Sequence, residues 1–174
     1  RGKLKKLSCS SAVRFKLDQL MESLEFSEKR VLQTIKEIRR FYHQDPELCQ
    51  AMAHLKSIPG IGEIVASHLL ARVGDPQQIG NVRQLAGFIG LAPTEHSTGD
   101  RVARGHITRS GDGKLRSKLI QAAWSAIRQD PELREFYRSV YQRHPRDRAA
   151  RKAIVAVARK LTTRIHAVAK QKRT

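Results

Sequence analysis

The pattern of hydrophobic and polar residues predicts one long helix near the start of the chain, from Phe15 to Tyr42. Apolar residues recur there every seven positions, and two more occupy the companion position of the repeat (Leu17, Leu24, Val31 and Ile38; Leu20 and Phe41). Ser27 and Thr34 interrupt the companion position, so the stripe is incomplete. Such a stripe is typical of a coiled coil or a helix bundle, and packing within the chain is as compatible with it as pairing with a second chain. We expect the basic, Ser-rich residues 1–14 to be frayed.

Capping residues and apolar spacing predict shorter helices in the rest of the chain. Asp45-Pro46 and Asp130-Pro131 each place a capping Asp before a Pro suited to the first helical position. Apolar spacing predicts further helices over Val82 to Ile89, from Lys114, from near Glu132, and from about Ala149 to Ala169. The predicted fold class is therefore all-α.

Residues 94–113 form the longest stretch without apolar periodicity. Four glycines fall in this stretch (Gly99, Gly105, Gly111 and Gly113). Long segments of this kind inside compact domains are usually functional or mobile. We therefore expect a mobile loop here.

The turn Pro59-Gly60-Ile61-Gly62 lies between two segments with helical patterns, within Leu55 to Leu70. Glycine has no Cβ, so the backbone can bend sharply and approach a partner closely. The N–H groups that open the second helix could then hold a phosphate. This arrangement is typical of a helix-hairpin-helix, which grips a nucleic-acid backbone without reading sequence. A purely structural corner between two helices is the alternative.

The charge of the chain favours a polyanionic partner. The 174 residues include 34 Lys and Arg against 16 Asp and Glu, a formal net charge of +18. Aromatic residues make up only 5% of the chain, which argues against base-stacking platforms and favours contact with duplex backbone. A merely basic soluble protein and an RNA-associated protein are the alternatives on charge alone.

Cysteine usage and hydropathy narrow the class of protein further. Cys9 and Cys49 form no CxxC motif, so structural zinc and a disulfide framework are not expected. No apolar run approaches membrane-spanning length and no signal-peptide pattern follows the N-terminus, which favours a reducing cytoplasm and no membrane partner. The chain starts with Arg, and we expect it to be a fragment of a longer protein.

Two basic segments are candidates for DNA contact. Between Arg101 and Lys118 there are six Lys and Arg against Asp112 alone, and thirteen more follow from Arg134 onward, where a solvated face is the alternative. With the turn, the first segment gives our predicted DNA-binding residues: Pro59, Gly60, Ile61, Gly62, Arg101, Arg104, His106, Thr108, Arg109, Lys114, Arg116 and Lys118.

The segment Pro93 to Asp100 offers hydroxyl groups next to this basic cluster. A serine there could attack a phosphodiester if neighbouring cations lowered its pKa and held the phosphate in line. From spacing alone, capping is the commoner role for Ser97, and a surface position is the commoner one for Glu95 and His96. No metal site, paired carboxylates or complete P-loop is recognisable, and Ser110 to Lys114 resembles a phosphate loop only loosely.

An ordered series of short motifs carries a family resemblance. The series comprises Pro59-Gly60-Ile61-Gly62, Leu85 to Pro93, Glu95 to Gly99, Gly105 to Asp112, Leu115-Arg116 and Ala122-Ala123. It resembles the C-terminal part of insertion-sequence transposases with a DEDD-type, RuvC-like nuclease domain, relatives of the Piv DNA invertase that are also called bridge recombinases. The likeness covers about Leu55 to Ala169.

The resemblance implies an active site split between two domains. The family's N-terminal domain holds a divalent metal such as Mg²⁺ with four acidic residues, and that domain has no counterpart here. The family's serine motif falls on Ser97-Thr98-Gly99, which makes Ser97 the predicted nucleophile. Many relatives have two adjacent serines here, and if the second position is the reactive one, Thr98 is the nucleophile. Thr98 is therefore the second choice. The chain alone is then expected to bind DNA without cutting it and to need no cofactor.

The resemblance also sets expectations for organisation and partners. We expect an N-terminal arm and long helix over residues 1–50, and a helix-hairpin-helix-containing transposase domain over 51–174. The partners implied are DNA, a guide RNA in some members, and further copies of the chain in a dimer or tetramer formed through the long helix. The implied location is the bacterial cytoplasm, at the nucleoid during activity. The alternative function is a non-catalytic helix-hairpin-helix DNA-binding module.

Overall fold

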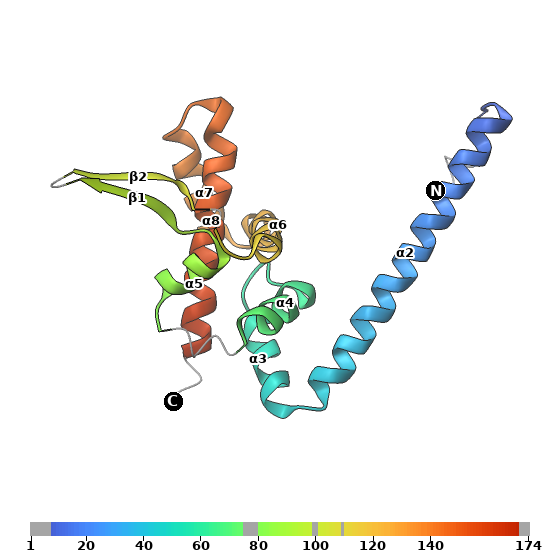
Figure 1. The fold of residues 1–174 in the computed structure, drawn as a ribbon, viewed down its shortest axis with the longest axis horizontal. Coiled ribbons are helices and arrows are strands. Elements are labelled where there is room, and N and C mark those ends of the chain that lie inside the picture. The colour runs from blue at the N-terminus through green and yellow to red at the C-terminus, as the bar shows by residue number, and fades with distance from the viewer. Residues whose placement is uncertain (1–7, 75–79, 99–100, 109, 171–174) are drawn as a thin grey trace. The chain divides into compact units, whose positions relative to one another are not determined.

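The computed structural model describes residues 8–74, 80–98, 101–108 and 110–170 (Figure 1). Its helices and strands follow in the order α2 (Ser11–His43), α3 (Pro46–Lys56), α4 (Glu63–Val73), α5 (Val82–Ile89), β1 (Pro93–Thr98), β2 (Arg101–Ile107), α6 (Gly113–Gln129), α7 (Pro131–Gln142) and α8 (Arg146–Lys170). Helices dominate, which confirms the predicted all-α class, and a single pair of short strands is added to them within the described residues. The chain divides into two compact units, residues 1–44 and 45–174.

The first unit is built on α2, a helix of 33 residues. Helical structure begins at Ser11, so the expectation of fraying is wrong for residues 11–14. The two polar residues that interrupt the stripe form hydrogen bonds with the backbone of their own helix. Ser27 Oγ donates to the Ser23 carbonyl (2.8 Å) and Thr34 Oγ1 to the Arg30 carbonyl (2.9 Å). Many large apolar side chains of the helix remain exposed: Val13, Phe15, Leu20, Leu24, Phe26, Val31, Leu32 and Phe41.

The core of the second unit surrounds α8, which packs against α3, α5, α6 and α7. Apolar side chains from α6, α7 and α8 are fully buried there: Leu115, Leu119, Leu133, Val157, Leu161 and Ile165. Each such side chain contributes about 1.5–3 kcal/mol on burial. The helix starts follow the predicted capping chemistry, since Asp45 accepts hydrogen bonds from the Glu47 and Leu48 amides and Asp130 accepts one from the Leu133 amide.

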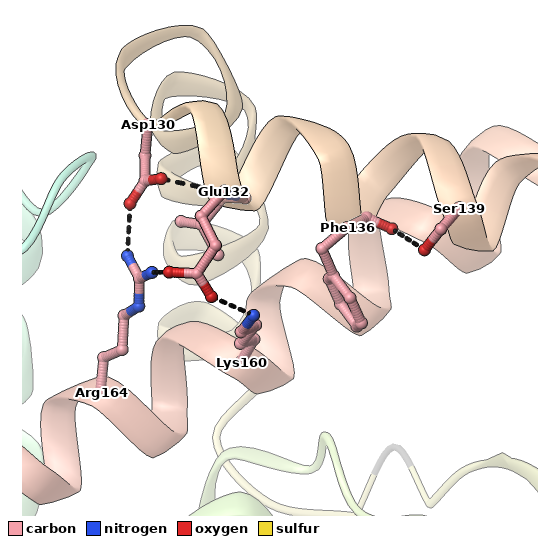
Figure 2. A network of polar contacts seen from close by, with 7 residues as sticks. Asp130, Glu132, Phe136, Ser139, Lys160 and Arg164 are labelled. Atoms are coloured by element: carbon pink, nitrogen blue, oxygen red, sulfur yellow. Dashed lines mark hydrogen bonds and ion pairs between the residues drawn. The ribbon is translucent and has the colours of Figure 1, made fainter.

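A network of charged side chains joins the start of α7 to α8 (Figure 2). The Arg164 guanidinium pairs with both Asp130 and Glu132, and Lys160 Nζ lies 2.6 Å from the Glu132 carboxylate. Lys160 also lies 4.9 Å from the centre of the Phe136 ring, a favourable cation–π distance. The N-cap of α7 and an acid of its first turn therefore compensate two of the cations on α8.

A second charged contact links α4 to the start of α6. Asp112 is the N-cap of α6, where its Oδ1 accepts from the Lys114 and Leu115 amides at 2.9 and 3.0 Å. Its other oxygen accepts a hydrogen bond from Arg72 of α4, and its side chain is only 5% exposed. The Leu115 amide and then the Arg72 guanidinium lower the pKa of Asp112 to about 2.

We expect these carboxylates to make the fold acid-sensitive. Hydrogen bonds from Arg164 lower the pKa of Asp130, and those from Lys160 lower the pKa of Glu132. A carboxyl whose pKa is lower in the folded state stabilises the fold above its unfolded pKa, and that stability disappears as the pH falls through the folded pKa. The free energy of unfolding, measured by urea titration, should therefore fall between about pH 5 and pH 2.

Asp112→Asn isolates the contribution of one charge, because asparagine also caps helices well. This variant should lose stability at neutral pH and show a shallower decline on acidification. An unchanged pH profile would contradict the assignment.

Two paired strands, Pro93–Thr98 and Arg101–Ile107, form a hairpin where we expect a loop. β1 and β2 pair antiparallel, with Pro93 opposite Ile107 and a bulge before Glu95 (Figure 1). The prediction of a loop is therefore wrong over the two strands. β1 is polar after Pro93, and the apolar residues of β2 (Val102, Ala103 and Ile107) do not alternate with polar ones. Neither strand therefore shows the apolar alternation that predicts a strand from sequence.

Candidate nucleic-acid interface

The turn between α3 and α4 is partly built into the core. Ile58 and Ile61 are each 4% exposed, while Gly62 lies at the surface. Gly60 has φ +85°, and a Cβ there would lie 2.5 Å from the Ala122 carbonyl oxygen of α6. The Gly60 amide also donates to Gln129 Oε1 at 3.2 Å. The structure thus gives Gly60 and Ile61 a packing role, and their contact with DNA stays a prediction.

The starts of α4 and α6 differ in whether their first-turn amides are available to bind a phosphate. Gly62, the N-cap of α4, has no side-chain oxygen, and no atom lies within 4 Å of the position a Cβ would take. At α6 the carboxylate of Asp112 already occupies the first-turn amides. The loose phosphate-loop likeness of Ser110 to Lys114 is therefore explained by helix capping, and the start of α4 is the better phosphate site.

The two strands of the hairpin leave the helices where the end of α5 meets the start of α6. The Thr108 amide donates to the Ala92 carbonyl and the Asp112 amide to the Phe88 carbonyl, both at 2.9 Å. Gly111 has φ +113°, and a Cβ there would lie 2.3 Å from the Phe88 carbonyl oxygen. Only a residue without a side chain fits this close crossing of two backbones. The strands therefore leave the helices from a fixed base.

Ser97 and Thr98 lie at the outer end of β1. In the strand register Ser97 is opposite Val102 and Thr98 is opposite Arg101. Ser97 is four positions after Pro93, which at strand spacing is about 13 Å from the base. The structure describes the backbone of residues 95–98 and 101–106, and it places the candidate nucleophile in a strand of the arm that extends from the helices (Figure 1).

The predicted basic contacts divide between the hairpin and α6. Arg101, Arg104 and His106 belong to β2, whereas Arg109 lies outside the described residues. Thr108 and Lys114 are exposed. Lys118 and Arg116 of α6 are half-buried, and Arg116 donates to the Ile89 carbonyl (3.1 Å) at the end of α5.

A groove of about 610 Å³ next to the base of β1 was not predicted from the sequence. Cations from α5 and α8 line it together with a hydroxyl and apolar side chains: Arg83, Arg159, Lys160, Thr163, Val82, Ala86, Ala92, Pro93, Phe136 and Ala156. Its members are up to 81 residues apart in the chain, so no local motif marks it. The signal in the sequence is the charge of α8, which has eight Lys and Arg against Asp147, and a solvated face is the alternative explanation of that charge.

The acidic residues are not arranged to hold a metal ion. In the parts of the chain that the structure describes, no three His, Cys, Asp or Glu side chains form a group suited to metal binding. Asp130 and Glu132 are close in sequence, but both pair with Arg164. These residues do not fit the family's divalent metal, and no metal-dependent step is assigned to them. Among the same described residues, no helix is both long and apolar enough to cross a membrane.

Curated relatives of the chain are transposases and DNA-inverting proteins by name. A "Probable family 20 transposase" from Pseudomonas aeruginosa is 34% identical over 112 residues, 64% of this chain and 32% of the relative. The "Pilin gene-inverting protein" of Moraxella bovis is 33% identical over 130 residues, 74% of this chain and 39% of the relative. The "Transposase for insertion sequence element IS1111A" of Coxiella burnetii is 40% identical over 82 residues, 47% and 22% of the two chains.

The matched region includes both the turn and the hairpin. The chain spans less than half the length of these relatives. The model of the transposase IS116/IS110/IS902 family matches residues 52–138, half of the chain, from α3 to α7. This stretch holds Gly62, Ser97 and the basic positions around them, and the chain belongs to the IS116/IS110/IS902 family of transposases.

Proposed function

We propose that this chain is the C-terminal, DNA-binding and nucleophile-bearing part of a transposase that cuts and rejoins DNA through a serine–DNA intermediate. The observation that carries the proposal is the position of Ser97 in β1, on a hairpin whose base follows α5 and is held to it by the hydrogen bond from the Ala92 amide to the Ala86 carbonyl. Arg101 and Arg104 of the paired strand β2 support it, and the cationic groove at the base of the hairpin, about 13 Å from Ser97, supports DNA binding. A hydroxyl near positive charge on a fixed support is the arrangement that phosphoryl transfer needs.

The proposed step is an in-line substitution at phosphorus. The Ser97 oxygen forms a bond to phosphorus while the bond to one deoxyribose oxygen breaks. The serine proton passes to a base, and the released deoxyribose oxygen takes up a proton. Attack by the released strand end of a second DNA would reverse the step and restore the serine. The divalent metal of the family's nuclease domain would stabilise charge on the reacting phosphate from outside this chain.

The contacts with DNA are proposed to be mainly electrostatic. The exposed start of α4 at Gly62 would hold a backbone phosphate, in the manner of a helix-hairpin-helix. The cations of β2 and α6, with Arg159 near the base of β1, would bind neighbouring phosphates. Backbone contacts of this kind position DNA without reading sequence. A guide RNA would bind through the same chemistry and supply that sequence information.

We propose that α2 joins copies of the chain into a dimer or tetramer. Leu24 and Val31, one heptad apart, are 49% and 52% exposed, so their apolar surface is available to a second helix.

Leu24→Glu should therefore lower the oligomeric state measured by light scattering, because a carboxylate would be buried in the seam. Leu32→Glu is the matched control, since Leu32 is 67% exposed and lies off the seam. Equal effects of both substitutions would contradict a heptad interface.

The decisive test is capture of the covalent intermediate. The complete transposase is incubated with a suicide DNA substrate, denatured and digested, and the peptides are examined by mass spectrometry. A nucleotide attached to Ser97 is expected. Attachment to Thr98 would move the nucleophile to the second choice. Binding of DNA with no attachment to this hairpin would favour the non-catalytic DNA-binding module.

A further inference from the structure

Three of the chain's few aromatic side chains meet on one surface of α6 and α7. The ring centres of Trp124 and Tyr137 are 5.8 Å apart, and those of Tyr137 and Tyr141 are 6.0 Å apart. Trp124 is 42% exposed, while the two tyrosines are half-buried. The chain contains one Trp and three Tyr in total. Although aromatic residues are scarce in the chain as a whole, three of them gather here. We call Trp124, Tyr137 and Tyr141 the aromatic row.

Trp124 lies in the middle of a polar and basic face of α6. Every member of this face is exposed, and they follow one another at helical spacing: Lys114, Ser117, Gln121, Trp124 and Arg128. The opposite side of α6 holds the buried residues Leu115, Leu119, Ala122 and Ala126. Trp124 is thus the single large apolar residue on a face directed away from the core, and core packing does not explain it.

The charge around the aromatic row is mainly positive, although the exposed Glu135 also belongs to α7. α6 contains no Asp or Glu, and its cations include Lys114 and Arg128. On α7, Arg134 and Arg138 follow the same side as the tyrosines at helical spacing. Arg134 donates to the carbonyls of Ile127 and Arg128 at 3.0 and 2.8 Å, which holds its positive charge at the end of α6. The acid at the start of α7, Glu132, is instead paired with α8.

We propose that this surface binds unpaired DNA, with a base stacked on the Trp124 indole and the backbone held by Lys114, Arg128 and Arg138. Proteins bind single-stranded nucleic acid through flat aromatic rings surrounded by cations, because every base can stack on a ring and every phosphate can pair with a cation. An acidic protein segment would satisfy the charge but would leave the row of rings without a matching flat partner. The inference rests on the proposed function, since strand exchange leaves bases temporarily unpaired.

The single tryptophan gives this surface its own optical signal. The full chain is titrated with a twelve-nucleotide oligo(dT), with a duplex of equal length and with oligo(U), while tryptophan emission is recorded. Saturable quenching by oligo(dT), with little by the duplex, is expected. In a parallel titration with labelled oligo(dT), Trp124→Ala should weaken binding by about 5- to 150-fold, and Trp124→Phe by less.

Phe88→Ala is the matched control, because Phe88 of α5 is also an aromatic residue 42% exposed. It should leave oligo(dT) binding within about twofold, and circular dichroism checks that each variant folds. Duplex binding without quenching by oligo(dT) would overturn the inference and leave the proposed function standing. No binding of either DNA would count against the proposed function itself. Stronger quenching by oligo(U) than by oligo(dT), or equal losses in the Trp124 and Phe88 variants, would also overturn the inference.

Discussion

Replacing Ser97 with alanine is expected to abolish strand exchange by the complete transposase and to leave its affinity for DNA unchanged. The hydroxyl is the atom that forms the covalent bond, so its removal should lower the rate on the order of 10³-fold or more. Ser97 is one residue of a two-stranded ribbon whose base is closed by the Thr108–Ala92 hydrogen bond and held to α5 by the Ala92–Ala86 hydrogen bond. A smaller side chain at this position should not disturb those bonds. The measurements are a recombination assay and the dissociation constant for duplex DNA.

Thr98→Ala is the matched control for this substitution. Thr98 is the neighbouring residue of β1 and also has a hydroxyl group, so both variants remove the same kind of group from the same strand. Retained exchange in Thr98→Ala and lost exchange in Ser97→Ala would support the assignment. The reverse pattern would assign the nucleophile to Thr98. Full activity in both variants would reject a nucleophile on this hairpin.

The hairpin that holds these residues was the main element missed from the sequence. Apolar alternation is the usual sign of a strand, and the run from Thr94 to Thr98 contains no large apolar residue. One local signal was present and overlooked. Gly99-Asp100 is a two-residue step of the kind that joins hairpin strands, and the observed pairing of Thr98 with Arg101 agrees with it.

The helices were predictable because their signals are local. Asn81 accepts a hydrogen bond from the Gln84 amide at the start of α5, and Gly90 ends that helix with φ +77°. The residue types at these two positions therefore indicate where the helix begins and ends. The cationic groove and the aromatic row depend instead on contacts between α5, α7 and α8 or between α6 and α7. Such contacts join residues far apart in the chain. Periodicity reports which face of a helix is buried, but not which helix covers it.

Gly60→Ala is expected to cause the largest loss of stability among substitutions in the α3–α4 turn. An alanine there must adopt φ near +85°, which costs about 1–2 kcal/mol for a residue with a Cβ. Its Cβ would also lie 2.5 Å from the Ala122 carbonyl oxygen and 2.7 Å from Ala126 Cβ. Overpacking of this kind adds about 1–3 kcal/mol, so the free energy of unfolding should fall by about 2–5 kcal/mol. Urea denaturation followed by circular dichroism measures this loss.

Gly62→Ser, two residues further along the same turn, separates packing from DNA contact. Gly62 has φ −89° and open space around it, and serine is a favourable N-cap, so the fold should keep its stability within about 0.5 kcal/mol. The added hydroxyl would occupy first-turn amides of α4 that we assign to a DNA phosphate, and duplex affinity should therefore fall while the fold persists. Gly60→Ala as stable as Gly62→Ser would mean that the turn does not pack on α6. Unchanged duplex affinity in Gly62→Ser would remove the start of α4 from the interface and leave DNA binding to the cations of β2, α6 and α8.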